Sequence, residues 1–154
     1  VVRVNCGASL DYRAPGGAVW QADRPLEEGT SWGYVGEAGA ATRRQRIEGT
    51  PMQQMYARER YGMNAYRFDL PAGEYLVRLH FAEGWVQGPG RRVFDVKVNA
   101  ETVLDDFDIH EEAGGRYKAT HRDVPVEVGP KGLTIGFEPV EDNPSINGIE
   151  IFRK

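Results

Sequence analysis

The sequence has almost none of the cysteine that disulfides and many zinc sites require. Cys6 is the only cysteine among 154 residues, so the chain can form neither an internal disulfide nor a metal-binding cysteine pair. No apolar run approaches the roughly 18 residues that a transmembrane helix needs. The formal net charge of −4 does not favour binding to nucleic acid or to an anionic membrane. We therefore expect neither nucleic acid nor membrane as a partner.

Motifs for common catalytic chemistries are also missing. The chain has three histidines, His80, His110 and His121. None of them has the four-residue spacing by which a helix binds zinc. No serine stands in a Gly-x-Ser-x-Gly motif, and no phosphate-binding glycine loop is present. Nothing in these patterns supports a catalytic role, and we expect neither an enzyme nor a bound cofactor.

One acidic segment could bind a metal. It contains Asp105, Asp106, Asp108, Glu111 and Glu112. Its spacing differs from that of an EF-hand loop, and it shows no facing pair of carboxylates of the kind that glycosidases use. We interpret the segment as a solvent-exposed acidic turn. A structural calcium ion is the alternative, because calcium prefers hard oxygen ligands.

The chain is rich in glycine, in proline and in segments where apolar and polar residues alternate. Nineteen glycines and nine prolines provide many turns. Apolar and polar residues alternate over the segments 1–6, 66–70, 74–83, 92–99, 102–107, 124–128, 133–137 and 148–152. These segments predict eight or nine short strands, as in an all-β sandwich of two sheets. Segments 66–70 and 74–83 flank the turn at residues 71–73 and predict a hairpin.

Helix is scarce. The best candidate is residues 50–60, with Thr50 as the N-cap and Pro51 at the first helical position. Residues 7–49 are rich in glycine and weakly patterned, which indicates long functional loops. Both ends of the chain read as strands that can pair with each other. We interpret residues 1–154 as one domain, excised from a longer protein.

Four aromatic residues stand beside glycine or in loop-like segments: Trp32, Tyr34, Tyr61 and Trp85. Sugars present flat patches of C–H groups that stack on aromatic faces, while carboxylates and amides bind the hydroxyls. Asp142 and Asn143 could serve in that second role. The alternative is that each ring caps the core from a loop. Trp20, in a strand-like segment, reads as core.

The chain resembles malectin and the malectin-like carbohydrate-binding modules. The residues that carry the resemblance are the segments 4–7, 19–23, 56–61, 73–75, 79–83, 92–99, 104–109 and 143–151. The resemblance implies a jelly-roll-like β-sandwich, similar to galactose-binding domains, with one or two short helical turns. It also implies a ligand held by loops at one end of the sandwich.

The resemblance extends to individual site residues. It implies that Tyr61, Trp85 and Asp142 contact the sugar. A tyrosine of the first loop matches Tyr34, with Trp32 as the alternative. Val86 stands where malectin has a second aromatic residue, so one stacking face is missing and the malectin specificity need not apply.

We therefore predict a non-catalytic module that binds an oligosaccharide or polysaccharide. Tyr34, Tyr61 and Trp85, with Trp32 as a possible addition, would form stacking walls. Asp142 would accept hydrogen bonds from hydroxyls, with Asn143 as a weaker helper. The module would sit beside a catalytic domain in a secreted or periplasmic glycoside hydrolase. The alternative function is a structural module that packs on that catalytic domain and binds no sugar.

Overall fold

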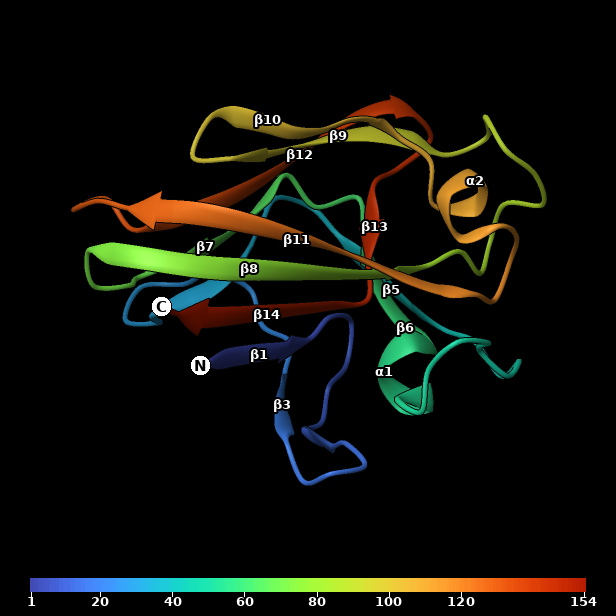
Figure 1. Ribbon diagram of the computed structural model, residues 1–154, viewed down its shortest axis with the longest axis horizontal. Helices are drawn as coiled ribbons and strands as arrows, with labels where there is room; N and C mark the ends of the chain where they lie inside the picture. Colours follow the sequence, from blue (N-terminus) through green and yellow to red (C-terminus); the bar gives the residue numbers. More distant parts are fainter.

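The molecule is built mainly of two large β-sheets (Figure 1). The computed structural model describes all 154 residues. The six-stranded sheet has the order β11 (Ala119–Val128), β8 (Gly73–Ala82), β14 (Gly148–Arg153), β1 (Val2–Asn5), β3 (Val19–Ala22), β2 (Tyr12–Arg13). The five-stranded sheet has the order β10 (Glu101–Phe107), β9 (Val93–Val98), β12 (Leu133–Glu141), β7 (Ala65–Phe68), β4 (Trp32–Val35). A small third sheet has the order β13 (Ser145–Ile146), β6 (Arg58–Tyr61), β5 (Gly39–Thr42). The predicted all-β sandwich is confirmed.

The main core lies between the two large sheets. Val77, Leu79 and Phe81 point into it from β8, and Phe94 and Val96 point into it from β9; each is fully buried. These side chains recur at every second residue because successive residues of a strand face opposite sides of a sheet. Each buried side chain of this size contributes about 1.5–3 kcal/mol relative to exposure. The alternation in the sequence therefore fixes which face of each strand is inside.

The predicted hairpin between segments 66–70 and 74–83 is wrong. β7 pairs with β4 and β12, whereas β8 pairs with β11 and β14. The turn at residues 71–73 thus carries the chain from one sheet to the other. Two alternating strands fit opposite sides of one core as well as they fit neighbouring places in one sheet, so the pattern alone could not distinguish these arrangements.

The predicted helix over residues 50–60 is also too long. Only one turn forms, α1 (Gln53–Tyr56), and it starts after Met52 without a side-chain cap. Thr50 accepts a hydrogen bond from the Met52 backbone N–H (3.0 Å) instead of capping the helix. The following residues form β6, which pairs with β5 and β13. Strand pairing from distant segments therefore outweighs the local helical pattern.

A second short helix, α2 (Ile109–Ala113), occupies part of the predicted acidic turn. The Asp108 carboxylate accepts a hydrogen bond from the Glu111 backbone N–H (3.1 Å) and so acts as an N-cap. Gly114 ends the helix at φ +82°, a conformation that glycine adopts without strain. Asp108 is buried, so this residue does not belong to a solvated turn. Neither helix has the length and apolar character required to cross a bilayer.

Residues 7–49 are more ordered than the sequence predicted, because β2, β3, β4 and β5 lie within them. Trp20, in β3, is fully buried, as expected. The first and last strands pair antiparallel from Val2–Ile151 to Asn5–Gly148, and the two chain ends lie side by side in Figure 1. The predicted pairing of the terminal strands is confirmed.

Candidate functional site

A hollow of about 360 Å³ lies where β5 and β6 meet the β8–β9 and β12–β13 loops. Its lining includes Arg43, Glu59, Tyr61, Trp85, Arg92, Asp142 and Asn143. Four of the six predicted site residues are thus brought together from three separate segments: Tyr61, Trp85, Asp142 and Asn143. The hollow combines two aromatic rings with carboxylate, amide and guanidinium groups.

The Trp85 indole is 63% exposed, which is unusual for a tryptophan. Its backbone is held by the buried Glu83 carboxylate, which accepts hydrogen bonds from the backbone N–H groups of Trp85 (3.0 Å) and Val86 (3.3 Å). The Val86 side chain is buried and anchors the loop, while the neighbouring Trp85 side chain points into solvent. The exposed ring therefore stands on a fixed backbone.

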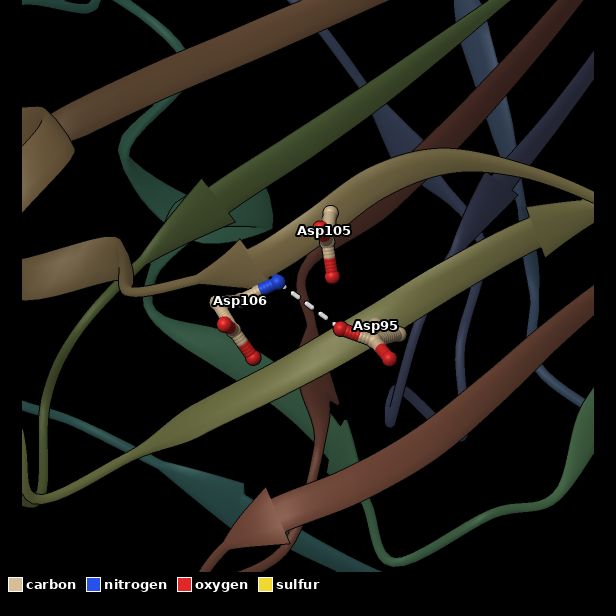
Figure 2. A group of neighbouring side chains, drawn as sticks. All are labelled: Asp95, Asp105 and Asp106. Atoms are coloured by element: carbon tan, nitrogen blue, oxygen red, sulfur yellow. Dashed lines mark hydrogen bonds between the residues drawn. The ribbon is translucent and has the colours of Figure 1, made fainter.

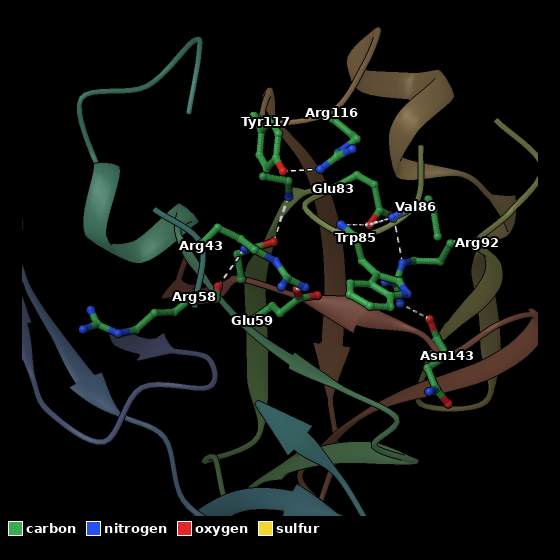
Figure 3. Close-up of polar contacts among 12 residues, drawn as sticks. Arg43, Arg58, Glu59, Glu83, Trp85, Val86, Arg92, Arg116, Tyr117 and Asn143 are labelled. Carbon is green, nitrogen blue, oxygen red and sulfur yellow. Dashed lines mark hydrogen bonds and ion pairs between the residues drawn. The ribbon is translucent and has the colours of Figure 1, made fainter. Parts of the chain in front are cut away.

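Glu83 is neutralised by an equally buried arginine. Arg92 Nε lies 2.7 Å from Glu83 Oε1, and both side chains are almost inaccessible to solvent. Arg92 also donates to the backbone carbonyl of Asn143 (Figure 3). One guanidinium group thereby ties the β8–β9 loop to the β12–β13 loop and sets the distance between Trp85 and Asp142.

A second buried carboxylate, Glu59, lines the inner part of the hollow. Arg43 Nη2 lies 2.6 Å from Glu59 Oε1, while Glu59 Oε2 has no hydrogen-bond partner. Burial raises the pKa of Glu59, against the opposing effects of Arg92 and Arg43. No sequence pattern singled out Arg43, Glu59 or Arg92. A strand over residues 58–61 places Glu59 and Tyr61 on one face, whereas the local pattern predicts a helix over residues 50–60.

The Tyr61 ring packs against Gly39 of the neighbouring strand β5. Tyr61 pairs with Gly39, and a Cβ atom added to Gly39 would lie 2.3 Å from Cζ of the Tyr61 ring. Only glycine leaves room for the ring at this position. Tyr61 therefore forms a fixed wall of the hollow.

Asp142 lies exposed at the rim with a left-handed backbone (φ +58°). Its Oδ1 accepts a hydrogen bond from the Asn143 backbone N–H (2.7 Å), and its Oδ2 has no partner within the protein. A carboxylate oxygen is thus available to a ligand hydroxyl group.

Trp32 and Tyr34 do not belong to this hollow. Trp32 is 5% exposed in β4 and stacks on Phe68, with ring centroids 5.9 Å apart. The Arg24 guanidinium lies 4.2 Å from the Trp32 centroid. The prediction of Trp32 as an open stacking wall is therefore wrong. It failed because the glycine-rich segment forms an edge strand rather than a loop.

Tyr34 lies in the same strand and is partly buried. Arg60 covers its ring at 4.1 Å from the centroid, and its edge packs on Tyr66. Tyr34 does not line the hollow, so the structure does not bring it together with Tyr61 and Trp85.

Residues 1–149 match the family model of the malectin domain. The chain belongs to the malectin domain family. Among curated proteins, it is 40% identical over 91 residues to Receptor-like protein 4 of Arabidopsis thaliana, covering 56% of this chain and 14% of that protein. It is 32% identical over 90 residues to Malectin-B of Xenopus laevis, covering 56% of this chain and 32% of that protein.

The fold of this malectin domain also resembles part of a solved bacterial enzyme. The Bacteroides uniformis β-glucuronidase superposes with a TM-score of 0.91 at 23% identity, over 99% of this chain and 18% of that chain. At this identity the likeness shows the fold alone. The chain thus spans less than a third of each of the two relatives and of this enzyme.

A separate acidic cluster lies on the paired strands β9 and β10 of the five-stranded sheet (Figure 2). The carboxylates of Asp95, Asp105 and Asp106 lie within 4.8 Å of one another. The charges of Asp106 and Asp95 raise the pKa of Asp105. The Asp106 backbone N–H donates to Asp95 Oδ1 (2.7 Å). Asp95 joins the cluster in place of Asp108, and a structural calcium ion here stays the alternative to a solvent-exposed acidic turn.

Proposed function

We propose that this malectin domain binds a carbohydrate, without catalysis, in the hollow between Tyr61, Trp85 and Asp142. The observation that carries the proposal is the exposed Trp85 indole on a loop fixed by buried charges. The C–H face of a sugar ring would stack on Trp85, with Tyr61 as a second wall. Asp142 would accept hydrogen bonds from hydroxyl groups, and the Asn143 side chain would add a weaker contact.

The arrangement of the carboxylates supports a binding role rather than hydrolysis. A glycosidase places two carboxyl groups on either side of the bond to be cleaved. In this hollow, Asp142 is exposed, but Glu59 is 2% exposed and its Oε1 is paired with Arg43. The two carboxylates therefore differ strongly in exposure and do not form an open pair on either side of a bound ligand.

The affinity should be modest, because a site open to solvent removes little water from each hydroxyl group. We expect dissociation constants between about 1 μM and 1 mM, which correspond to roughly −8 to −4 kcal/mol. Trp85 supplies the largest apolar surface available to the ligand.

A glycan array followed by calorimetry tests the proposal. We expect the domain to bind at least one glycan class, and Trp85→Ala to weaken binding by at least about tenfold. The stability of this variant should change by less than about 0.5 kcal/mol, because the ring is exposed. Leu10→Ala is the matched control, since Leu10 is 74% exposed and lies outside the hollow.

Three results would contradict the proposal. Binding by Trp85→Ala as tight as by the wild type would show that the site lies elsewhere. Silence on the whole array would favour the alternative, a module that packs on a catalytic domain and binds no sugar. Release of free sugar from a bound glycan would instead indicate an enzyme.

We also propose a context for this domain within a longer protein. The likeness in fold to a section of a β-glucuronidase supports a place beside a catalytic domain in a secreted or periplasmic glycoside hydrolase. Sequencing the gene on both sides of this segment tests the idea. We expect an adjoining glycoside hydrolase domain, and a gene without one would contradict it.

A further inference from the structure

A second hollow, of about 410 Å³, lies against Trp85 and extends toward α2 and β11. Trp85 and Arg43 line both this hollow and the one described above. The other charged residues of the second hollow are Arg44 and Arg116. We refer to it as the basic hollow.

The basic hollow differs in charge from the rest of the protein. It contains three arginines and no carboxylate, although the whole chain carries a net charge of −4. Arg44 is exposed, and neither Arg44 nor Arg116 forms an ion pair. Gln45 and Gln87 add neutral amide groups to the lining. The hollow therefore offers positive charge with no internal counter-charge except the Glu59 carboxylate behind Arg43.

Two of the three guanidinium groups are held in place before any ligand arrives. Arg116 lies over the Tyr117 ring, 4.6 Å from its centroid, and donates to the Tyr117 hydroxyl group (Figure 3). The Tyr117 backbone N–H in turn donates to the Glu83 carbonyl (2.8 Å). Arg116 is thus tied to the same loop that carries Trp85.

Arg43 is held in place by contacts with Gly84, Ala57 and Trp85. Its side chain packs on Gly84, where an added Cβ atom would lie 2.7 Å from Arg43 Cγ. Its backbone N–H donates to the Ala57 carbonyl (2.7 Å), and its guanidinium carbon lies 5.7 Å from the Trp85 centroid. Both Arg43 and Arg116 keep a buried Nε–H that has no acceptor in the protein. Arg116 is therefore positioned without a counter-charge, whereas Arg43 shares its charge with Glu59.

We infer that the basic hollow binds an anionic group of the saccharide whose neighbouring ring stacks on Trp85, and this inference rests on the proposed function. The anion is a carboxylate, as in a uronic acid, or a sulfate ester. Arginine binds both oxyanions through paired N–H groups, and such charge-assisted bonds are stronger than neutral ones. Because Trp85 borders both hollows, one acidic oligosaccharide can occupy them together.

The experiment compares pairs of glycans that differ in a single charge. One pair consists of a uronic-acid oligosaccharide and its carboxyl-reduced form, and the other consists of a sulfated oligosaccharide and its desulfated form. We expect the charged member of at least one pair to bind about tenfold tighter than its neutral partner. The pair that shows the difference identifies the anion.

Substitutions in the basic hollow test whether the preference for the charged glycan arises there. Arg44→Gln combined with Arg116→Gln should remove the preference for the charged glycan, because the remaining Arg43 is already paired with Glu59. The readout is the ratio of the affinities for the charged and the neutral glycan, measured with the same variant. Arg46→Gln is the matched control, because Arg46 is exposed and lines neither hollow. Raising the salt from about 0.05 to 0.5 M should weaken binding of the charged glycan alone, because salt screens exposed charges. Thermal unfolding of each variant confirms that it is folded.

The outcomes separate the two proposals. Equal binding of charged and neutral glycans, or a preference that persists in the double variant, overturns the basic hollow as an anion site and leaves the proposed function standing. A lack of binding to any glycan overturns the proposed function, and this inference with it.

Discussion

The Trp32 region and the Trp85 region each place an indole beside glycine, but the first is closed and the second is open. Trp32 lies in the edge strand β4, stacked on Phe68 and covered by Arg24. Trp85 lies in a loop with 63% of its surface exposed. The difference shows that pairing of a segment into a sheet, and not its glycine content, determines whether an aromatic ring is available to a ligand.

Charge is used differently in the two regions. Arg24 lies over the face of Trp32 and so occupies the surface that a ligand would need. Near Trp85, the buried pair of Glu83 and Arg92 lies under the loop and holds its backbone. A charged side chain therefore covers the Trp32 ring, whereas charged side chains below the loop keep the Trp85 ring exposed.

Removal of the Trp32 ring should have the largest effect on stability. Trp32→Ala leaves a cavity beside Phe68, and we expect the free energy of unfolding to fall by about 3–5 kcal/mol. Urea unfolding measures this change against Leu10→Ala. A loss below about 1 kcal/mol would show that Trp32 is not part of the core.

Loss of the Arg92 charge should affect both stability and binding. Arg92→Met keeps the length of the side chain but leaves Glu83 buried without its ion-pair partner. We expect a loss of about 3 kcal/mol, the lower end for a broken buried pair, because two backbone N–H groups still bind Glu83. Glycan binding should weaken as well, since the loop loses its anchor.

The neighbouring residue supplies the control for that experiment. Arg91→Met removes an exposed arginine that forms no ion pair and should leave both properties nearly unchanged. Equal effects of the two substitutions in urea unfolding would contradict an anchoring role for the buried pair.

The buried His80 should make the stability of the domain depend on pH. His80 in β8 contacts the Tyr56 hydroxyl (2.6 Å) and the Glu150 carboxylate (2.9 Å). Burial lowers the pKa of His80 below 6.5, although the hydrogen bond to Glu150 opposes this shift, and His121 and Arg78 add to it. The unfolded chain therefore takes up a proton at this residue more readily than the folded chain does.

The sign of the effect on stability follows from this difference. As the pH falls below about 6.5, the unfolded state binds the proton first and the domain loses stability, by at most about 1.4 kcal/mol per pH unit from one group. His80→Gln should remove this part of the dependence in thermal unfolding between about pH 5 and 7. An unchanged profile would show that His80 does not titrate in this way.

Local patterns predicted the open part of the site better than the closed part. Tyr61, Trp85 and Asp142, expected from local patterns and from the family resemblance, do line one hollow. Each lies at a loop or a strand end, where few distant contacts determine its position. Trp32 was misplaced because β4 is a strand only through its pairing with β7. Glu59 was missed for a related reason, since β6 depends on pairing with β5 and β13.

The same limit applies to the fold. Alternation identified β8, β9 and β12 and the face that each buries, because burial of every second side chain follows from strand geometry. It could not assign β7 and β8 to different sheets. That assignment depends on contacts between residues far apart in the chain.

The most direct test of the account is a titration of the ¹⁵N-labelled domain with a glycan that binds on the array, followed through the indole N–H signals of its three tryptophans. We predict that the Trp85 signal moves as the glycan is added, while the signals of the buried Trp20 and Trp32 stay in place. A moving Trp32 or Trp20 signal beside a stationary Trp85 signal would contradict the account.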